Sequence, residues 1–170
     1  MSKSRILGGH VRGDQREAAI PIRAIRAGES DVCERILRAL PEWFGIESAL
    51  VQYVGDAQRL PTWVAELDGR PAGFITLRQH FSRAAEIHCM AVVPELHRRG
   101  IGRALVEYVV AECRKLNVAY LQVKTLGPAR PHEPYARTRA FYEALGFLPL
   151  EEFPKLWPGN PALLLVRYVG

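Results

Sequence analysis

The chain has 170 residues, the size of a single domain, of which 48% are hydrophobic and 24% charged. Its formal net charge of +5 favours an anionic ligand. The basic residues are not interleaved with aromatic residues as in nucleic-acid-binding modules, so nucleic acid is not an expected partner. The cysteines, Cys33, Cys89 and Cys113, form neither a close pair nor a metal-binding spacing, which predicts a cytoplasmic chain without disulfides or metal.

No apolar stretch approaches the roughly 18 residues that a membrane-spanning helix needs, so we expect no membrane partner. Residues 1–19 are polar, contain Gly8, Gly9 and Gly13, and lack the apolar segment of a signal peptide. We interpret them as a flexible tail that precedes one domain over residues 20–170.

Hydrophobic periodicity predicts both strands and helices along the domain. Asp68-Gly69 tolerates the positive φ of a tight hairpin turn, while Pro41 and Gly146 are expected to end helices. In chain order we predict a strand at 20–28, helices at 30–40 and 47–55, hairpin strands at 61–67 and 70–79, a strand at 84–93, a helix at 101–116, a strand at 118–126, a helix at 135–146, and strands at 148–153 and 162–169. This order implies an α/β (α+β) domain whose mixed, mostly antiparallel central sheet is flanked by helices.

The turn between the strand at 84–93 and the helix at 101–116 combines glycine with positive charge. The first amide groups of that helix have no acceptor within the helix and form the positive end of its dipole. Gly100 and Gly102 leave the backbone accessible to a ligand, and arginines surround them. This arrangement favours a phosphate or pyrophosphate ligand. The alternative is an ordinary helix start with solvated arginines.

Two common phosphate-binding motifs match this turn poorly. A Walker loop needs Lys followed by Ser or Thr after its second glycine, and here Arg103-Ala104 follows. A dinucleotide-binding loop needs a third glycine, and Leu105 occupies its place.

The stretch "PELHRRGIGRAL", followed some 40 residues later by "AFYEALGF", resembles the GNAT superfamily of acyl-CoA-dependent N-acyltransferases. The resemblance covers residues 21–169 in element order as well as in motif. The family's loop is usually Arg/Gln-x-x-Gly-x-Gly/Ala; His97 stands at its first position here, while Gly100 and Gly102 match. An asparagine that often precedes the later tyrosine is replaced by Ala136. The resemblance implies a single GNAT-like domain with acetyl-CoA as co-substrate and no metal.

The resemblance also implies where acetyl-CoA binds. The strand before the turn is expected to splay from its neighbour, so that its backbone contacts the pantetheine arm and polarises the thioester carbonyl. The turn is expected to bind the phosphates. The implied cofactor-binding residues are Met90, Ala91, Val92, Val93, His97, Arg98, Arg99, Gly100, Ile101, Gly102, Arg103 and Ala104.

Candidate acid–base residues lie on the same strand and on the last helix. Strict alternation places Glu86, His88 and Met90 on one face of the strand and Ile87, Cys89 and Ala91 on the other. Some family members carry a general-base glutamate at the equivalent of Glu86. We therefore expect Glu86 to act as the base, directly or through water, with His88 as its competitor; a solvated glutamate and a packed histidine are the alternatives.

Tyr142 matches the family's tyrosine that protonates the departing thiolate. A phenol with a pKa of about 10 is protonated at neutral pH and can donate that proton. The alternative is a tyrosine that only packs against its neighbours.

Two functions of different classes follow. The first is an N-acetyltransferase that acts on a primary amine of a small molecule or protein, and the second is a GNAT-like module that binds acyl-CoA without turnover. Tyr142 and Glu86 favour the enzyme. Family analogy makes Trp43, Phe44, Trp157 and the loop at 127–134 candidate walls of the acceptor site. Candidates to attract a cationic amine are Glu47, Glu133, Glu151 and Glu152.

We also expect a homodimer. The resemblance implies that such domains often pair through late strands. The apolar run at 162–166 is longer than a strand with one buried face needs.

Overall fold

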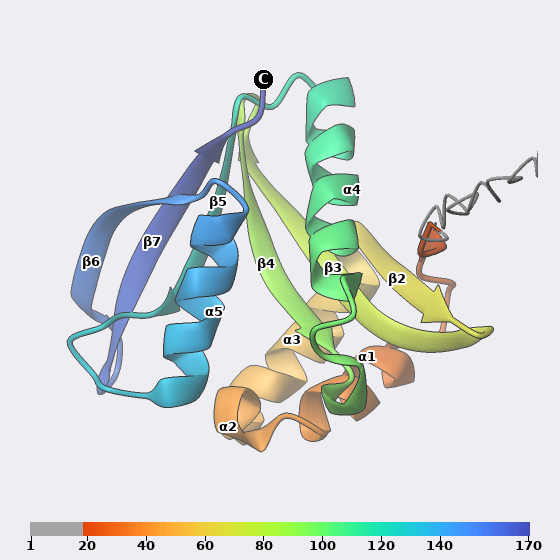
Figure 1. Cartoon of the computed structure of the whole chain (residues 1–170), viewed down its shortest axis with the longest axis horizontal. Coiled ribbons are helices and arrows are strands. Elements are labelled where there is room, and N and C mark those ends of the chain that lie inside the picture. The colour runs from red at the N-terminus through yellow and green to blue at the C-terminus, as the bar shows by residue number, and fades with distance from the viewer. Residues whose placement is uncertain (1–18) are drawn as a thin grey trace, which may run out of the picture.

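The computed structural model describes residues 19–170 (Figure 1), so the expected tail lies outside the described residues apart from its last position. The elements in chain order are β1 (Ile22–Ala24), α1 (Ser30–Arg38), α2 (Pro41–Phe44), α3 (Glu47–Arg59), β2 (Thr62–Leu67), β3 (Arg70–Phe81), β4 (Ala84–Val92), the 3₁₀ helix η1 (Pro94–Leu96), α4 (Ile101–Lys115), β5 (Tyr120–Leu126), α5 (Glu133–Ala144), β6 (Leu148–Trp157) and β7 (Asn160–Tyr168).

The strands form one mixed sheet in the order β1-β2-β3-β4-β5-β7-β6. Only the β4–β5 pair is parallel, and every other neighbouring pair is antiparallel. Helices α4 and α5 cover one face of this sheet, and α1, α2 and α3 lie on the other (Figure 1). The fold class expected from the sequence is therefore confirmed.

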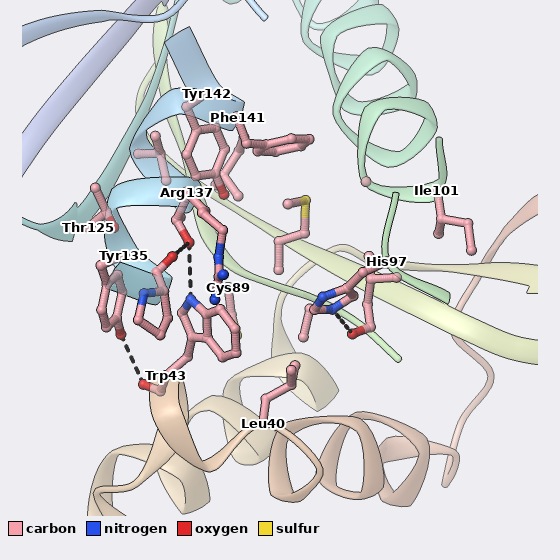
Figure 2. A pocket seen from close by; sticks show the side chains of 18 of the residues that line it. Leu40, Trp43, Cys89, His97, Ile101, Thr125, Tyr135, Arg137, Phe141 and Tyr142 are labelled. Carbon is pink, nitrogen blue, oxygen red and sulfur yellow. Dashed lines mark hydrogen bonds between the residues drawn. The ribbon is translucent and has the colours of Figure 1, made fainter. Parts of the chain in front are cut away.

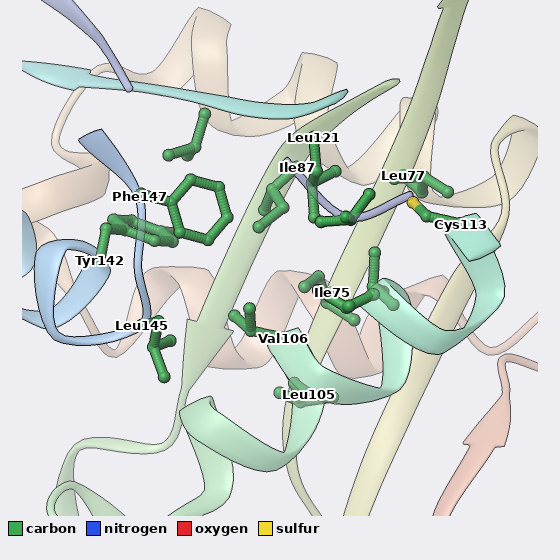
Figure 3. Packing of buried hydrophobic residues seen from close by; sticks show 14 of the residues in the cluster. Ile75, Leu77, Ile87, Leu105, Val106, Cys113, Leu121, Tyr142, Leu145 and Phe147 are labelled. Atoms are coloured by element: carbon green, nitrogen blue, oxygen red, sulfur yellow. The ribbon is translucent and has the colours of Figure 1, made fainter. Parts of the chain in front are cut away.

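Two apolar clusters hold these layers together. The larger one joins the inner side of α4 to the sheet and to the end of α5, where Tyr142, Leu145 and Phe147 are buried together (Figure 3). The smaller one joins α1 and α3 to the opposite face around Phe74. Helix α5 and the start of α4 are thereby fixed relative to the middle of the sheet.

Some element boundaries differ from the expectation. Pro41 does not simply stop a helix: α1 already ends at Arg38, and Pro41 begins α2, since proline is favoured at a first helical position. Strand β6 runs on to Trp157, so the segment expected as a long connection is mostly strand. A tight turn at Pro158-Gly159 closes the β6–β7 hairpin, and Gly159 takes the positive φ of 69° that the turn requires.

Strands β4 and β5 part in the middle of the sheet, as expected. Their pairing ends at Ile87 and Val123, although β4 continues to Val92 and β5 to Leu126. Beyond this point the two strands share no backbone ladder. An opening therefore forms at the one parallel pair, next to the start of α4.

A β-bulge at His88 changes which side chains share a face. The β3–β4 register passes from Thr76 opposite Cys89 to Leu77 opposite Ile87, which leaves His88 as an extra residue. Ile87 packs in the α4-side cluster, whereas Cys89 packs in the α1–α3-side cluster. The predicted common face of Ile87, Cys89 and Ala91 is therefore wrong, because strict alternation holds only in an unbroken ladder.

Candidate active site

A cavity of about 990 Å³ occupies the opening between β4 and β5 (Figure 2). Side chains from α2, α3, β4, α4, β5 and α5, together with Trp157 at the end of β6, line it. The candidate walls Trp43, Phe44 and Trp157 all reach it, whereas of the loop at 127–134 only Pro134 does. The cavity thus joins the glycine turn, the splayed strands and α5 in one space.

The glycine turn presents unpaired amides to this cavity. Arg98 and Gly100 both have left-handed backbone conformations, with φ of 65° and 79°. Helix α4 begins at Ile101 without a side-chain hydrogen bond that caps it. Alternation of right- and left-handed conformations and an uncapped helix start both orient amide groups towards an anion. The turn therefore has the geometry of a phosphate site.

Glycine suits positions 100 and 102 of the turn for different physical reasons. Gly100 adopts a positive φ, and a Cβ there would meet nothing within 4 Å. A Cβ on Gly102 would lie 3.2 Å from Cζ of Phe141, so this glycine allows α4 and α5 to approach each other. Both glycines line the cavity. That they leave the backbone accessible to a ligand stays a prediction.

Most of the expected cofactor-binding residues line the cavity: Met90, Ala91, Val92, His97, Arg98, Gly100, Ile101, Gly102 and Arg103. Ala104 is not among its lining residues. Val93 and Arg99 instead line a separate cavity of about 440 Å³. The adjacent arginines Arg98 and Arg99 therefore face different spaces.

The backbone of β4 faces the opening at every second residue. The amide of Val93 donates to Ala72 on β3 at 2.9 Å, so alternation directs the backbone groups of Met90 and Val92 away from β3. His97 Nε2 donates to the carbonyl of Val92 at 2.9 Å. Met90 is therefore the residue whose amide and carbonyl best match the expected contact with a thioester arm.

Tyr142 lines the cavity from α5 and is 5% exposed. Its ring packs edge to face with Phe141 and Phe147 (Figures 2 and 3). Burial raises the pKa of Tyr142 above its ordinary value. The phenol is therefore protonated at neutral pH, as a proton donor must be.

His88 also lines the cavity and is held by a carboxylate on α3. Asp56 Oδ2 accepts from Nε2 of His88 at 2.8 Å and from Nη2 of Arg78 at 3.0 Å. Nη2 of Arg78 also lies 3.3 Å from Nε2 of His88, but the shorter contact is with Asp56, which can only accept. We therefore assign the ring proton to Nε2 and the lone pair to Nδ1. Burial lowers the pKa of His88 and Arg78 lowers it further, against the raising effect of Asp56 and Glu86. The net pKa is lowered, so the imidazole is neutral at pH 7.

Glu86 lies outside the residues that line the cavity. Its Oε2 accepts from Nζ of Lys124 at 2.8 Å and from Nε2 of His80 at 2.6 Å. Burial raises the pKa of Glu86, but the hydrogen bonds from Lys124 and His80 outweigh it, and the net pKa is lowered. Glu86 is thus an ionised partner of Lys124, which itself lines the cavity.

Sequence reasoning missed Asp56 and its neighbour Tyr53. The two residues stand three apart on α3 and so share a helix face, which is a detectable signal. The Tyr53 ring packs edge to face on His88, with centroids 5.4 Å apart. Nothing in the sequence links this face to the bulge in β4, 32 residues from Asp56.

Comparison with known families agrees with this geometry. A family model described as the acetyltransferase (GNAT) family matches residues 30–147, so the chain belongs to the GNAT acetyltransferase family. No curated protein matches the chain.

Several solved structures share the fold. A GNAT-family protein from Desulfovibrio desulfuricans is 19% identical, with a TM-score of 0.78 over 89% of this chain and 100% of that one. The ribosomal-protein-S18-alanine N-acetyltransferase of Escherichia coli is 20% identical, with a TM-score of 0.73 over 88% and 94%. An Elizabethkingia anophelis GNAT acetyltransferase with acetyl-CoA bound is 17% identical, with a TM-score of 0.68 over 89% and 99%.

Within residues 19–170, no helix combines the length and apolar character needed to cross a membrane. The same part of the chain holds no group of three or more His, Cys, Asp or Glu side chains arranged to bind a metal ion.

The lowered pKa of His88 is open to direct measurement. In an NMR titration we expect His88 to titrate below its ordinary value of 6.5. Asp56→Asn removes a carboxylate that favours the charged imidazolium, so the pKa of His88 should fall further. Asp31→Asn, on the exposed side of α1, is the matched control and should leave it unchanged. A His88 pKa at or above 6.5 in the unmodified protein would contradict the geometry.

Proposed function

We propose that this protein is an acetyl-CoA-dependent N-acetyltransferase of the cytoplasm that acts on a primary amine. The observation that carries the proposal is one continuous cavity that joins the phosphate-type turn at Gly100 to Tyr142 and His88. A module that only bound acyl-CoA would need the turn and the splayed strands, but neither a buried phenol nor a carboxylate-bound imidazole on the cavity wall.

The residues present fit acetyl-CoA. The amides that begin α4, with Arg98 and Arg103 beside them, match a pyrophosphate. The free backbone groups of Met90 match the amide-bearing pantetheine arm and a thioester carbonyl. When bound, acetyl-CoA supplies the acetyl group as a thioester.

The acid–base roles follow from access to the cavity. As the amine nitrogen bonds to the acetyl carbon, His88 takes the proton that the nitrogen loses. As the carbon–sulfur bond breaks, Tyr142 gives its proton to the sulfur. His88 therefore replaces Glu86 as the base that we propose to act directly. Glu86 can act only through a relay, because it does not line the cavity and already binds Lys124 and His80.

The turn predicts how coenzyme A binds. Coenzyme A should raise the Tm by mass action, since it binds the folded state. Arg98→Glu should remove most of this shift, because Arg98 lines the cavity. Arg99→Glu is a matched control with the same charge change one residue away, and it should keep most of the shift because Arg99 lines the other cavity. Equal shifts in the two variants would place the phosphates elsewhere.

Tyr142→Phe separates the enzyme from the binding module. The change keeps the packed ring and removes only the hydroxyl. If Tyr142 protonates the departing sulfur, kcat should fall by about 10²-fold while the affinity for acetyl-CoA changes little. Steady-state kinetics and the Tm shift with coenzyme A measure the two effects. Equal losses of rate and affinity would mark Tyr142 as a packing residue, and unchanged turnover would refute the acid role.

We also propose a homodimer, although not for the reason first expected. Strand β7 lies between β5 and β6, so the side chains of its apolar run are largely buried within the protein. Three exposed apolar side chains lie close together in sequence on β6, at the edge of the sheet, where Leu148, Leu150 and Leu156 are 68%, 64% and 48% exposed. An open apolar edge strand can pair with a second copy.

Light scattering at micromolar concentration tests this assembly. We expect twice the chain mass of 19.1 kDa for the unmodified protein. Leu150→Lys should give a single-chain mass with unchanged circular dichroism, because a charge on the β6 edge opposes pairing. A mass of 19.1 kDa for the unmodified protein would refute the dimer.

A further inference from the structure

Aromatic side chains form the walls of the cavity around the proposed base. Phe44 on α2 packs edge to face on Tyr53 on α3, with ring centroids 6.0 Å apart, and Tyr53 packs in the same way on His88. Tyr135 on α5 and Trp157 at the end of β6 line the same cavity. Figure 2 shows Tyr135 on the opposite side of the cavity from Ile101, where α4 begins. The space away from the phosphate turn is therefore bordered by flat apolar surfaces.

No carboxylate is among the side chains that line this cavity within residues 19–170. The buried carboxylates Asp56 and Glu86 each accept hydrogen bonds from basic side chains, among them His88 and Lys124 of the cavity wall. The acidic residues that the sequence suggested for attracting an amine do not reach the cavity either: Glu47, Glu133, Glu151 and Glu152. The charged side chains that do line it are basic: Arg98, Arg103, Lys124 and Arg137. A substrate with several positive charges would meet like charge and no counter-ion.

The same walls suit a single ammonium group on a flat body. Faces of tyrosine and tryptophan attract one cation and stack on an aromatic ring. The hydroxyl of Thr125 is buried on the cavity wall without a hydrogen-bond partner, so it offers one polar contact to a ligand.

Two hydrogen bonds form a bridge between α2 and α5 at one side of the cavity. Trp43 Nε1 donates to Oγ1 of Thr138 at 3.0 Å, and the hydroxyl of Tyr135 donates to the carbonyl of Trp43 at 2.9 Å (Figure 2). A bridge at this place favours a small molecule over a peptide chain, which needs an open groove along which to continue.

We propose that the acceptor is a small primary monoamine carried on an aromatic body, held by ring faces instead of carboxylates. This inference rests on the proposed acetyl transfer and adds the substrate class. The ammonium group binds against Tyr53 beside His88 and loses one proton to solvent before it attacks. His88 then takes the second proton as the carbon–nitrogen bond forms, and the aromatic body lies against Trp157 and Tyr135.

A panel of amines tests the substrate class. Release of coenzyme A from acetyl-CoA is measured with phenethylamine, spermidine, kanamycin and an alanine-initiated peptide at equal concentrations. We expect kcat/KM for phenethylamine to exceed the other values by at least about tenfold, since the difference is one of charge and aromatic contact. A higher value for spermidine, kanamycin or the peptide would overturn the inference and leave acetyl transfer intact.

Wall variants test where the aromatic body lies. Trp157→Ala should lower kcat/KM for phenethylamine at least about tenfold, mainly through KM, with the Tm shift by coenzyme A unchanged. Phe44→Leu changes a second aromatic residue of the cavity wall and should act in the same direction. Phe81→Ala removes an aromatic ring of 77% exposure that does not line the cavity, and it should change nothing. Wild-type kinetics in both wall variants would overturn the inference.

A variant that changes the preferred charge of the acceptor gives the most direct test. Trp157→Glu adds the carboxylate that the cavity lacks, so the ratio of kcat/KM for spermidine to that for phenethylamine should rise at least about tenfold. An unchanged ratio would contradict the inference. If coenzyme A raises the Tm but no amine is acetylated, the proposed enzyme function fails, and this inference fails with it.

Discussion

The parting of β4 and β5 is the constraint on which the site depends. A backbone ladder satisfies the N–H and C=O groups of a strand, and beyond Ile87 and Val123 these two strands no longer satisfy each other. Those groups must meet a ligand, water or a side chain, as His97 meets the carbonyl of Val92. The opening therefore creates both the cavity and the polar backbone wall along it, while α4 begins at one side and α5 closes the other.

The bulge at His88 determines which titratable side chain of β4 lies in the opening. An extra residue at the point where pairing with β5 ends turns one titratable side chain towards α3 and the cavity. Asp56 and Glu86 are buried carboxylates, and burial without partners would cost several kcal/mol each. Each is bonded to basic groups that balance its charge. A neutral imidazole and a protonated phenol are left facing the cavity.

The fold is shared with distant structures, whereas the side chains that line the cavity determine what it can bind. Structures only 17–20% identical to this chain share the sheet and its helices. The walls around the opening come here from α2, α3, α5 and the end of β6. The aromatic and basic side chains of these walls are the basis for the acceptor class that we infer.

Local patterns in the sequence were sufficient for the fold class and for locating the glycine turn and the helix with Tyr142, both of which line the cavity. The turn around Gly100 and the helix that carries Tyr142 depend on φ preference, helix dipoles and periodicity, which act over a few residues. The contacts of Glu86 and His88 depend on partners 38 and 32 residues away, across a parallel pair and between layers. Alternation assigned faces correctly only up to the bulge, because one inserted residue reverses every later side chain. Only the tertiary structure could therefore decide that His88 and not Glu86 lines the cavity, and that the cavity walls carry no carboxylate within the described chain.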